Sequence, residues 1–422
     1  MSMEQKVSRM AGTLIGSEII KLGGEINKRI AEGAKIYNLT IGDFNPAIFP
    51  IPGLLTDEIV NAYREGQTNY PPADGIMPLR QSVSDLLWEK QDLRYSPDEI
   101  LVAGGARPLI YAIYRTLIDP GDKVIFPVPS WNNNHYTHLS DGQQVLVETK
   151  PENHFMPVRA DIEPYIKDAA MLALCSPLNP TGTMFGREQL QGICELVISE
   201  NKRRAENGTK PLYLMYDQIY SLLSFGDKEH TDPVSLFPEL KEYTIFVDGI
   251  SKSFAATGVR VGWAFGPEYV IGKMRSILGH VGAWAPKAEQ VATARLLDNK
   301  EAVNTFLEQM KEEVSARLNA LYNGFKAMKE KGLPVDAIGP EGAIYLSVKF
   351  SLLGRSYKGK KIESTFGIAS LLISEASFAV VPFTAFGNAP GTEWFRISVG
   401  TCTEEQIPEM LVQLENFLKN VE

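Results

Sequence analysis

The stretch FVDGISKSF, residues 246–254, joins a strand-like apolar run to a lysine that sits among small residues. The run ends abruptly at Asp248-Gly249, and Lys252 follows shortly after it. Where little else is charged, desolvation disfavours the ammonium form of a lysine and lowers its pKa. The neutral amine is a nucleophile that can form a Schiff base with an aldehyde. A lysine in a solvated surface loop is the alternative and, for a lysine taken alone, the more common case.

Apolar strand-like runs and helical patterns alternate on both sides of this stretch. We expect strands at residues 99–103, 123–126, 169–175, 212–216, 244–247 and 261–265, and helices at 54–65, from about 78, at 107–117 and at 187–200. Continuous apolar strands that alternate with helices predict a mostly parallel sheet covered on both faces. Ligands gather at the carboxyl ends of the strands in such sheets, and Lys252 follows one of those ends.

After about residue 295 the pattern changes. A helical stripe is followed by shorter strands and helices, which we expect at residues 300–331, 342–350, 368–375, 378–381, 394–399 and in a final amphipathic helix. This mixture predicts a second, α+β domain, and we expect the amino-terminal segment to join it. There we expect one helix over residues 13–32 and a strand at 36–41. The charged stretches 202–210 and 358–361 are interpreted as a surface insertion and a lysine-rich loop.

Composition limits the possible functions. A chain of 422 residues predicts two domains, one of them large. The net charge of −9 argues against general nucleic-acid binding, which needs a basic face. The three cysteines and five histidines show no spacing typical of metal ligands, so we expect no metal site. Because neither a signal-peptide pattern nor an apolar run of about 18 residues is present, we expect a cytoplasmic protein with no membrane contact.

Three polar features at predicted strand ends could bind a ligand, and each also has a structural alternative. Gly104-Gly105-Ala106 opens a helix, where backbone N–H groups favour an anion, but it could be only a tight turn. Asp217 could bind a metal, cap a helix or pair with a protonated ring nitrogen. The amide of Asn179 could donate to a phenolate or hydroxyl, or Asn179-Pro180 could simply build a turn.

Two larger side chains are equally ambiguous when taken singly. Trp131 follows a predicted strand, where it could stack on a planar ring or pack in the core. Arg396 is a charge inside an apolar strand pattern. Its planar guanidinium could hold a carboxylate bidentately, or it could form a buried salt bridge within the protein.

The order of these features along the chain is specific. The sequence resembles the fold-type I, pyridoxal-phosphate-dependent aminotransferases of class I/II, in particular the aspartate aminotransferase-like group, from about Ile36 to the C-terminal helix. The motifs that carry the resemblance are Tyr70 with Gly75 and Leu79-Arg80, residues 104–106, Asp119-Pro120-Gly121-Asp122, residues 179–182, Asp217 with Tyr220, Ser251-Lys252, residues 257–262 and Arg396.

The resemblance implies a fold and an assembly. The fold is α/β, with a seven-stranded, mainly parallel sheet in an α/β/α sandwich. Residues 45–295 would form the large, cofactor-binding domain, and residues 1–44 with 296–422 a small α+β domain built from both chain ends. The protein would be a homodimer with its active sites at the interface.

The resemblance also implies roles for individual residues toward pyridoxal 5′-phosphate. Lys252 would hold the aldehyde as an internal aldimine and later shuttle a proton. Asp217 would pair with the pyridinium nitrogen, so that the ring acts as an electron sink. The remaining contacts are Asn179 and Tyr220 to the phenolic oxygen, Trp131 stacked on the ring, and Gly105, Ala106, Ser251, Arg260 and the second subunit's Tyr70 at the phosphate.

For the substrate, the resemblance implies that Arg396 binds the α-carboxylate, with the backbone near Gly42 and the amide of Asn179 beside it. The reaction would be ping-pong transamination between an L-amino acid, aspartate-like or aromatic, and a 2-oxo acid. The chain departs from the usual pattern at Gln218, where an acid is common, and at Ala106, where some aspartate-specific relatives have a lysine. Arg107 and Lys287 are our candidates for contact with a distal carboxylate.

Other functions on the same scaffold remain open at this point. A β-lyase or an enzyme similar to ACC synthase would share Lys252, Asp217 and Arg396, and would differ in its products. A cofactor-binding transcriptional regulator is disfavoured by the acidic charge and by the roughly 35 residues that precede the first motif. A catalytically dead relative is disfavoured because all three residues are present.

Overall fold

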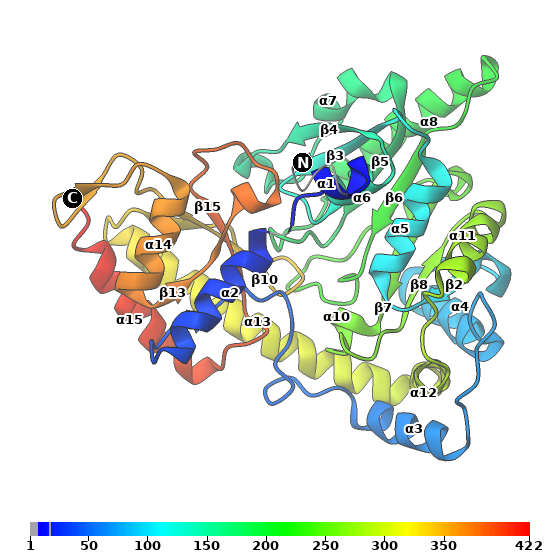
Figure 1. The fold of residues 1–422 in the computed structure, drawn as a ribbon, viewed down its shortest axis with the longest axis horizontal. Helices are drawn as coiled ribbons and strands as arrows, with labels where there is room; N and C mark the ends of the chain where they lie inside the picture. Colours follow the sequence, from blue (N-terminus) through cyan, green and yellow to red (C-terminus); the bar gives the residue numbers. More distant parts are fainter. Residues whose placement is uncertain (1–6, 17) are drawn as a thin grey trace.

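The computed structural model describes residues 7–16 and 18–422, and its largest sheet has seven strands (Figure 1). In spatial order the strands are β2 (Ile100–Ala103), β8 (Gly262–Phe265), β7 (Thr244–Gly249), β6 (Tyr213–Asp217), β5 (Ala169–Cys175), β3 (Lys123–Val128) and β4 (Gln143–Glu148). Strand β8 is antiparallel to both of its neighbours, and the remaining pairs are parallel. The predicted seven-stranded, mainly parallel sheet is confirmed.

Helices cover both faces of this sheet. One face packs against α4 (Met77–Gln91), α8 (Arg187–Glu206) and α12 (Lys287–Asp298), and the other against α5 (Ala106–Leu117), α6 (Asn133–Leu139) and α11 (Glu268–Val281). Successive strand residues point to opposite faces. Ile100 and Val102 therefore belong to the first core, while Leu101 and Ala103 belong to the second. Strands buried on both sides explain why their sequences are apolar without interruption.

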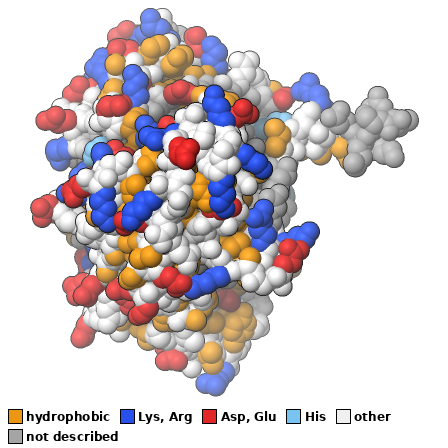
Figure 2. Space-filling view, turned by 90° about the vertical axis from the view of Figure 1, so that its left-hand side faces the viewer, with side chains coloured by type: hydrophobic (Ala, Val, Ile, Leu, Met, Phe, Trp, Pro, Cys, Tyr) orange, Lys and Arg blue, Asp and Glu red, His pale blue; other side chains and the backbone are white. Residues whose placement is uncertain are grey.

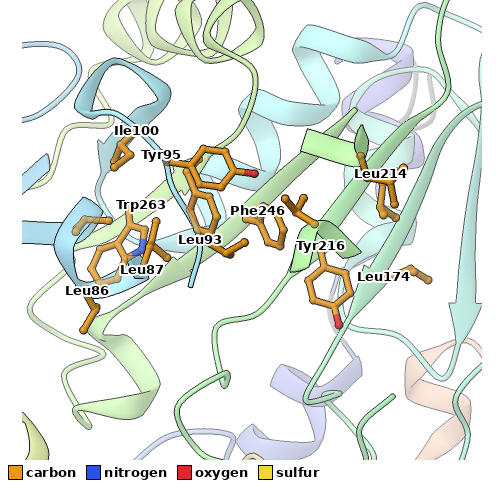
Figure 3. Packing of buried hydrophobic residues seen from close by; sticks show 14 of the residues in the cluster. Leu86, Leu87, Leu93, Tyr95, Ile100, Leu174, Leu214, Tyr216, Phe246 and Trp263 are labelled. Atoms are coloured by element: carbon orange, nitrogen blue, oxygen red, sulfur yellow. The ribbon is translucent and has the colours of Figure 1, made fainter. Parts of the chain in front are cut away.

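Aromatic side chains pack tightly around β7, the strand that ends at the lysine stretch (Figure 3). The rings of Phe246 and Phe265 are stacked with 4.6 Å between their centroids. Tyr95 and Tyr216 meet Phe246 edge to face at 6.2 Å and 5.8 Å. Because such rings bury large apolar areas in defined geometry, they hold β7 firmly within the sheet.

A second core surrounds an antiparallel four-stranded sheet. Its strands, in spatial order, are β14 (Val381–Pro382), β15 (Trp394–Ser398), β10 (Tyr345–Phe350) and β9 (Val335–Ala337), and it packs with α14 (Thr365–Ala376) and α15 (Ile407–Leu418). Helix α13 (Lys300–Glu330) joins the two cores (Figure 1). Val303 and Leu307 belong to the core of the large sheet, whereas Met310 and later apolar residues belong to the second.

The amino-terminal segment packs with the carboxyl-terminal part of the chain. Strand β1 (Tyr37–Asn38) pairs in parallel with β13 (Phe378–Ala379). This pairing and the separate second core support the division into residues 45–295 and residues 1–44 with 296–422, which stays a prediction. Acidic and basic side chains are interspersed on the face shown in Figure 2. Among residues 7–16 and 18–422, no helix is long and apolar enough to cross a membrane.

Two expectations from the sequence are wrong. The expected single helix over residues 13–32 is divided into α1 (Arg9–Thr13) and α2 (Glu18–Ala31), and Leu14 between them is extended. Residue 17 lies outside the described residues. Gly16 lies within this break, and glycine is a weak helix former.

The stretch 202–210 is not a surface insertion, because α8 continues through Glu206. Its charges are partly buried: Arg204 Nε donates to Glu200 Oε1 at 2.6 Å, and Arg204 Nη2 donates to the carbonyl of Ala169 at 2.7 Å. The charge pattern alone could not show this pairing.

Other elements were missed or incompletely predicted. The lysine-rich stretch 358–361 closes a small hairpin of β11 (Ser356–Tyr357) and β12 (Lys360–Lys361). Elements absent from the prediction include β4, β9, α6, α11 and α12, together with the short helices α7 (Arg159–Ile162) and α9 (Pro233–Leu236). Helix α3 (Gly53–Arg64) lies within one residue of its predicted bounds at each end.

The buried charge pair of α8 gives a test of the fold. We expect Arg204→Ala to lower the free energy of unfolding by about 3 kcal/mol, because it removes the buried partner of Glu200 and leaves several backbone carbonyls buried without a donor. The matched control is Arg203→Ala. The guanidinium of Arg203 also pairs with Glu200, but it is half-exposed, so this substitution should lower the stability much less. Urea denaturation measures both, and equal losses would contradict the assignment.

Candidate active site

A cavity of about 730 Å³ opens at the carboxyl ends of β5, β6 and β7. Residues far apart in the sequence meet on its wall. The predicted site residues that line it are Gly42, Ala106, Trp131, Asn179, Asp217, Tyr220, Ser251, Lys252, Arg260 and Arg396. Because the carboxyl ends of parallel strands share one edge of the sheet, the turns that follow them converge there.

Lys252 lies on the short helix α10 (Ile250–Ser253), which begins directly after β7. Its Nζ donates to the carbonyl oxygen of Gly42 at 2.7 Å. Burial, together with the positive charges of Arg396, Arg107 and Arg260, lowers the pKa of Lys252 to about 8 against the opposing effect of Asp43. A substantial fraction of this amine is therefore neutral, and nucleophilic, near neutral pH.

Asp217 is the last residue of β6. Its Oδ1 accepts a hydrogen bond from the backbone N–H of Ile219 at 3.1 Å. Burial raises the pKa of Asp217 to about 6, while that N–H and the charge of Lys252 act in the opposite direction. An enclosed carboxylate of this kind would be stabilised by a cationic group bound in the cavity, such as a protonated ring nitrogen.

Arg260 stands beside the turn that joins β2 to α5. Its Nη2 donates to the carbonyl of Gly104 at 2.8 Å and its Nη1 to that of Thr257 at 2.6 Å. A Cβ atom at Gly105 would overlap the guanidinium, so only glycine allows this approach. Gly105 also has a φ of +94°, a region that side chains disfavour. The cationic fork and the N–H groups at the start of α5 form a cradle suited to a phosphate.

Arg396 is 1% exposed and lies in the interior of β15. Its Nη1 donates to Asn179 Oδ1 at 3.1 Å and its Nη2 to the carbonyl of Thr40 at 2.5 Å. Its Nε is buried without a partner among the described residues. Both hydrogen-bond acceptors are neutral, so the guanidinium charge remains available to an anion. A carboxylate of a bound ligand would satisfy it.

Tyr345, which sequence reasoning missed, completes the polar wall. Its hydroxyl lies 2.6 Å from that of Tyr220, and its ring lies under the guanidinium of Arg396, 4.8 Å away. Strand β10 pairs with β15 so that Tyr345 faces Ser398, two residues from Arg396. A tyrosine at the start of a predicted strand gave no signal by itself, because only this pairing brings it to the cavity.

The remaining predicted residues have different positions. Arg107 lines the cavity, with its guanidinium carbon 5.6 Å from the centre of the Trp131 ring. Lys287 lies outside the cavity and donates to Asn69 Oδ1 at 2.7 Å. Tyr70 is 82% exposed and meets the Trp284 ring edge to face at 5.2 Å, in a groove apart from the cavity.

Several cavity residues carried no recognisable motif. They include Thr40, Asp43, Ser130, Asn133, Cys175 and Met215. Most of them neighbour a predicted site residue along the chain, as Ser130 neighbours Trp131. A search of the residues that flank each predicted strand end could have found these, although not their contacts.

Comparisons with known proteins agree along the whole chain. A family model described as aminotransferase class I and II matches residues 34–414. The aspartate aminotransferase of Bacillus sp. (strain YM-2) is 27% identical, with 99% of this chain and 100% of that protein covered. The crystal structure of the aspartate aminotransferase from Rhizobium meliloti superposes with a TM-score of 0.89, at 27% identity and 99% coverage of both chains.

A further solved structure is that of the aspartate aminotransferase from Thermus thermophilus with maleate. It superposes with a TM-score of 0.86 at 28% identity, and covers 98% of this chain and 99% of that one.

The environment of Lys252 predicts an unusual titration. In protein without bound cofactor, we expect its amine to react with acetic anhydride with a midpoint near pH 8, because burial disfavours the charged form. Lys300 is exposed and has a raised pKa owing to Glu89, so it should react only at much higher pH. Peptide mass spectrometry after competitive labelling compares the two lysines in one sample. Identical midpoints would contradict the proposed environment.

Proposed function

The chain belongs to the class I and II aminotransferases and is an enzyme of amino-group transfer, and we propose that it uses pyridoxal 5′-phosphate to move the amino group of a dicarboxylic L-amino acid to a 2-oxo acid. The observation that carries the proposal is the convergence of Lys252, Asp217 and Arg396 on one cavity. In each of these groups, a charge or a nucleophilic atom remains available to a bound molecule.

The chemistry of the cavity fits this cofactor. Arg260 and the turn at Gly105 would hold the phosphate, with Ser251 and Ala106 beside them. Asp217 would stabilise a protonated ring nitrogen, and Trp131 would stack on the ring. Because Asn179 Oδ1 accepts from Arg396, its amide nitrogen is the atom that can donate to a phenolic oxygen, together with the Tyr220 hydroxyl.

The protein's own groups then account for the reaction. When bound, pyridoxal phosphate supplies an aldehyde that takes up the amino group and a ring that withdraws electrons from the substrate α-carbon. Arg396 binds the substrate α-carboxylate and orients the α-carbon. Lys252, in its neutral form, takes the proton from that carbon at Nζ and acts as general base and then acid. Two such half-reactions in succession predict ping-pong kinetics.

The charges of the cavity favour a dicarboxylic donor. The positive charge of Arg260 would be neutralised by the phosphate, and that of Arg396 by the α-carboxylate. Arg107 forms no ion pair with a described residue and would face a second carboxylate on the substrate. The Thermus thermophilus relative was solved with maleate, which is a dicarboxylate. An aromatic donor would instead leave Arg107 without an anionic partner.

We further propose a homodimer in which Tyr70 completes the site of the second copy. Its side chain is exposed and lies outside the cavity of its own chain. The groove beside it, of about 540 Å³ and lined by Trp284 and Lys287, offers a surface for such a copy. Of the two candidates for contact with a distal carboxylate, Arg107 lines the cavity and Lys287 lies in this groove.

The role of Lys252 can be tested by its removal. We expect Lys252→Ala to lose covalent attachment of the cofactor. We also expect its kcat to fall about 10²- to 10⁴-fold, the usual contribution of a general base. Borohydride reduction followed by intact-mass measurement detects the attachment. The exposed Lys273→Ala is the control and should resemble the wild type. If the wild-type protein released pyruvate and ammonia in the absence of an acceptor 2-oxo acid, it would be a β-lyase instead.

The role of Arg107 can be tested by substrate preference. We expect Arg107→Gln to lower kcat/KM for L-aspartate about 10- to 100-fold, the effect of losing a hydrogen bond between charged groups. The value for L-phenylalanine should change less than about threefold, because that substrate has no distal charge. Lys287→Gln is the matched control and should leave the ratio of the two substrates unchanged. Equal losses for both substrates would refute a distal-carboxylate contact.

A further inference from the structure

A buried polar cluster lies next to the cavity without lining it. Its centre is Asp248, the penultimate residue of β7, whose side chain is buried together with that of Gln218. Ser221 is buried as well, and Gln91 and His230 stand at the edge of the cluster. None of these residues contacts the cavity, so the proposed reaction leaves the cluster without a role.

Asp248 uses both carboxylate oxygens. Its Oδ2 accepts from Gln218 Nε2 at 3.1 Å and from Ser221 Oγ at 3.2 Å, and its Oδ1 accepts from the backbone N–H of Gly249 at 2.7 Å. Gln218 Nε2 also donates to Gln91 Oε1 at 3.0 Å. Its Oε1 lies 3.3 Å from His230 Nε2. The network is therefore directional, with donors that converge on one carboxylate.

The partners of Asp248 lie beside the residues proposed to hold the cofactor. Gln218 follows Asp217, and Ser221 follows Tyr220. Asp248 itself begins the turn that leads to Lys252. One carboxylate thus links the segment that carries the ring contacts to the segment that carries the amine.

Backbone packing at this point makes the link important. A Cβ atom at Gly249 would lie 2.7 Å from the Cα of Gly262. No side chain can therefore separate these two backbones or set the direction of the turn. The registered pairing of strands β6 and β7 ends at Asp217 and Val247, where the backbone N–H of Gln218 still donates to the carbonyl of Val247 at 2.9 Å. Beyond that bond, the side chain of Asp248 adds the hydrogen bonds from Gln218 and Ser221.

A buried carboxylate at Asp248 is energetically unfavourable. Burial raises the pKa of Asp248 to about 7, and the nearby negative charge of Asp217 adds to this effect. His230 offers no compensating charge, since burial lowers its pKa to about 4. A neutral side chain of similar size would be cheaper to bury. Retention of the acid therefore points to a role beyond packing.

We propose that Asp248 is a positioning residue. Through Gln218 and Ser221, it holds Asp217 and Tyr220 at a set distance from Lys252. The protein can then bind the ring and the aldehyde of one cofactor at the same time. This inference rests on the proposed function of the cavity. Gln218 is an amide at a position where the sequence pattern of the family commonly has an acid, and in this structure the acid of the pair is Asp248.

Three variants test the proposal: Asp248→Asn, Gln218→Glu and the double variant Q218E/D248N. Asp248→Asn places an amide against the amide of Gln218, and Gln218→Glu places two acids together. The double variant exchanges the two groups and restores an acid–amide hydrogen bond at unchanged net charge. Ser221→Ala is a milder variant that removes one hydrogen bond if a single exchange prevents folding.

The readouts are the dissociation constant for pyridoxal phosphate and the pH midpoint of the absorption change of the bound cofactor, both measured without substrate. We expect each single exchange to weaken cofactor binding on the order of tenfold, typical of residues in one hydrogen-bond network, and to shift the midpoint. In the double variant, the dissociation constant should return to within about twofold of the wild-type value, and the pH midpoint should return to that of the wild type. In turnover, kcat should fall more than KM rises.

Two results would overturn the proposal. Single exchanges that lower only the unfolding midpoint, with cofactor affinity and pH midpoint unchanged, would make Asp248 a purely structural residue. A double variant no better than the sum of the single exchanges would also refute the link. Wild-type protein that binds no pyridoxal phosphate would instead contradict the proposed function, which keeps the two failures distinct.

Discussion

The close approach of three backbone segments at Gly105, Gly249 and Gly262 is the constraint on which the site depends. A Cβ atom at Gly262 would lie 2.8 Å from the backbone of Gly105, and one at Gly249 would lie 2.7 Å from Gly262. Side chains at these positions would force the segments apart. Their absence lets the turn after β2, the turn before Lys252 and the segment after Arg260 share one small volume. The phosphate cradle and the amine are neighbours because of this contact.

The concentration of positive charge around the cavity follows from the same close packing of segments. Lys252, Arg260 and Arg396 are each hydrogen-bonded to backbone carbonyls or an amide, and none of these acceptors carries a charge. Concentrating cations in a partly enclosed space without anionic partners costs stability. The same arrangement leaves their charges available to phosphate and carboxylate groups, and it lowers the pKa of Lys252 toward the range in which an amine can act. Sites that bind anions accept this compromise between stability and function.

Prediction from sequence succeeded where the signal is local. Strand β5 has its predicted bounds, and β6 and β7 begin within one residue of theirs, because an apolar run bounded by turn residues is visible in a short window. The missed strand β4 is largely exposed and lacks such a run. The helix over 187–200 was ended too early because Arg204 and its neighbours resemble a solvated stretch. Arg204 is buried because it donates to carbonyls more than thirty residues away.

The amino-acid sequence by itself determined the apolar strands, the glycines and the spacing that places a lysine just after a strand end. These are properties of neighbouring residues, and steric and hydrophobic rules act on them directly. Only the tertiary structure decided that Lys252 reaches the carbonyl of Gly42, 210 residues away, and that Tyr345 meets Tyr220. It also decided that Asp248 is buried among donors rather than solvated at a loop. Such contacts depend on how separate elements pack, and no local pattern encodes the distance between two turns.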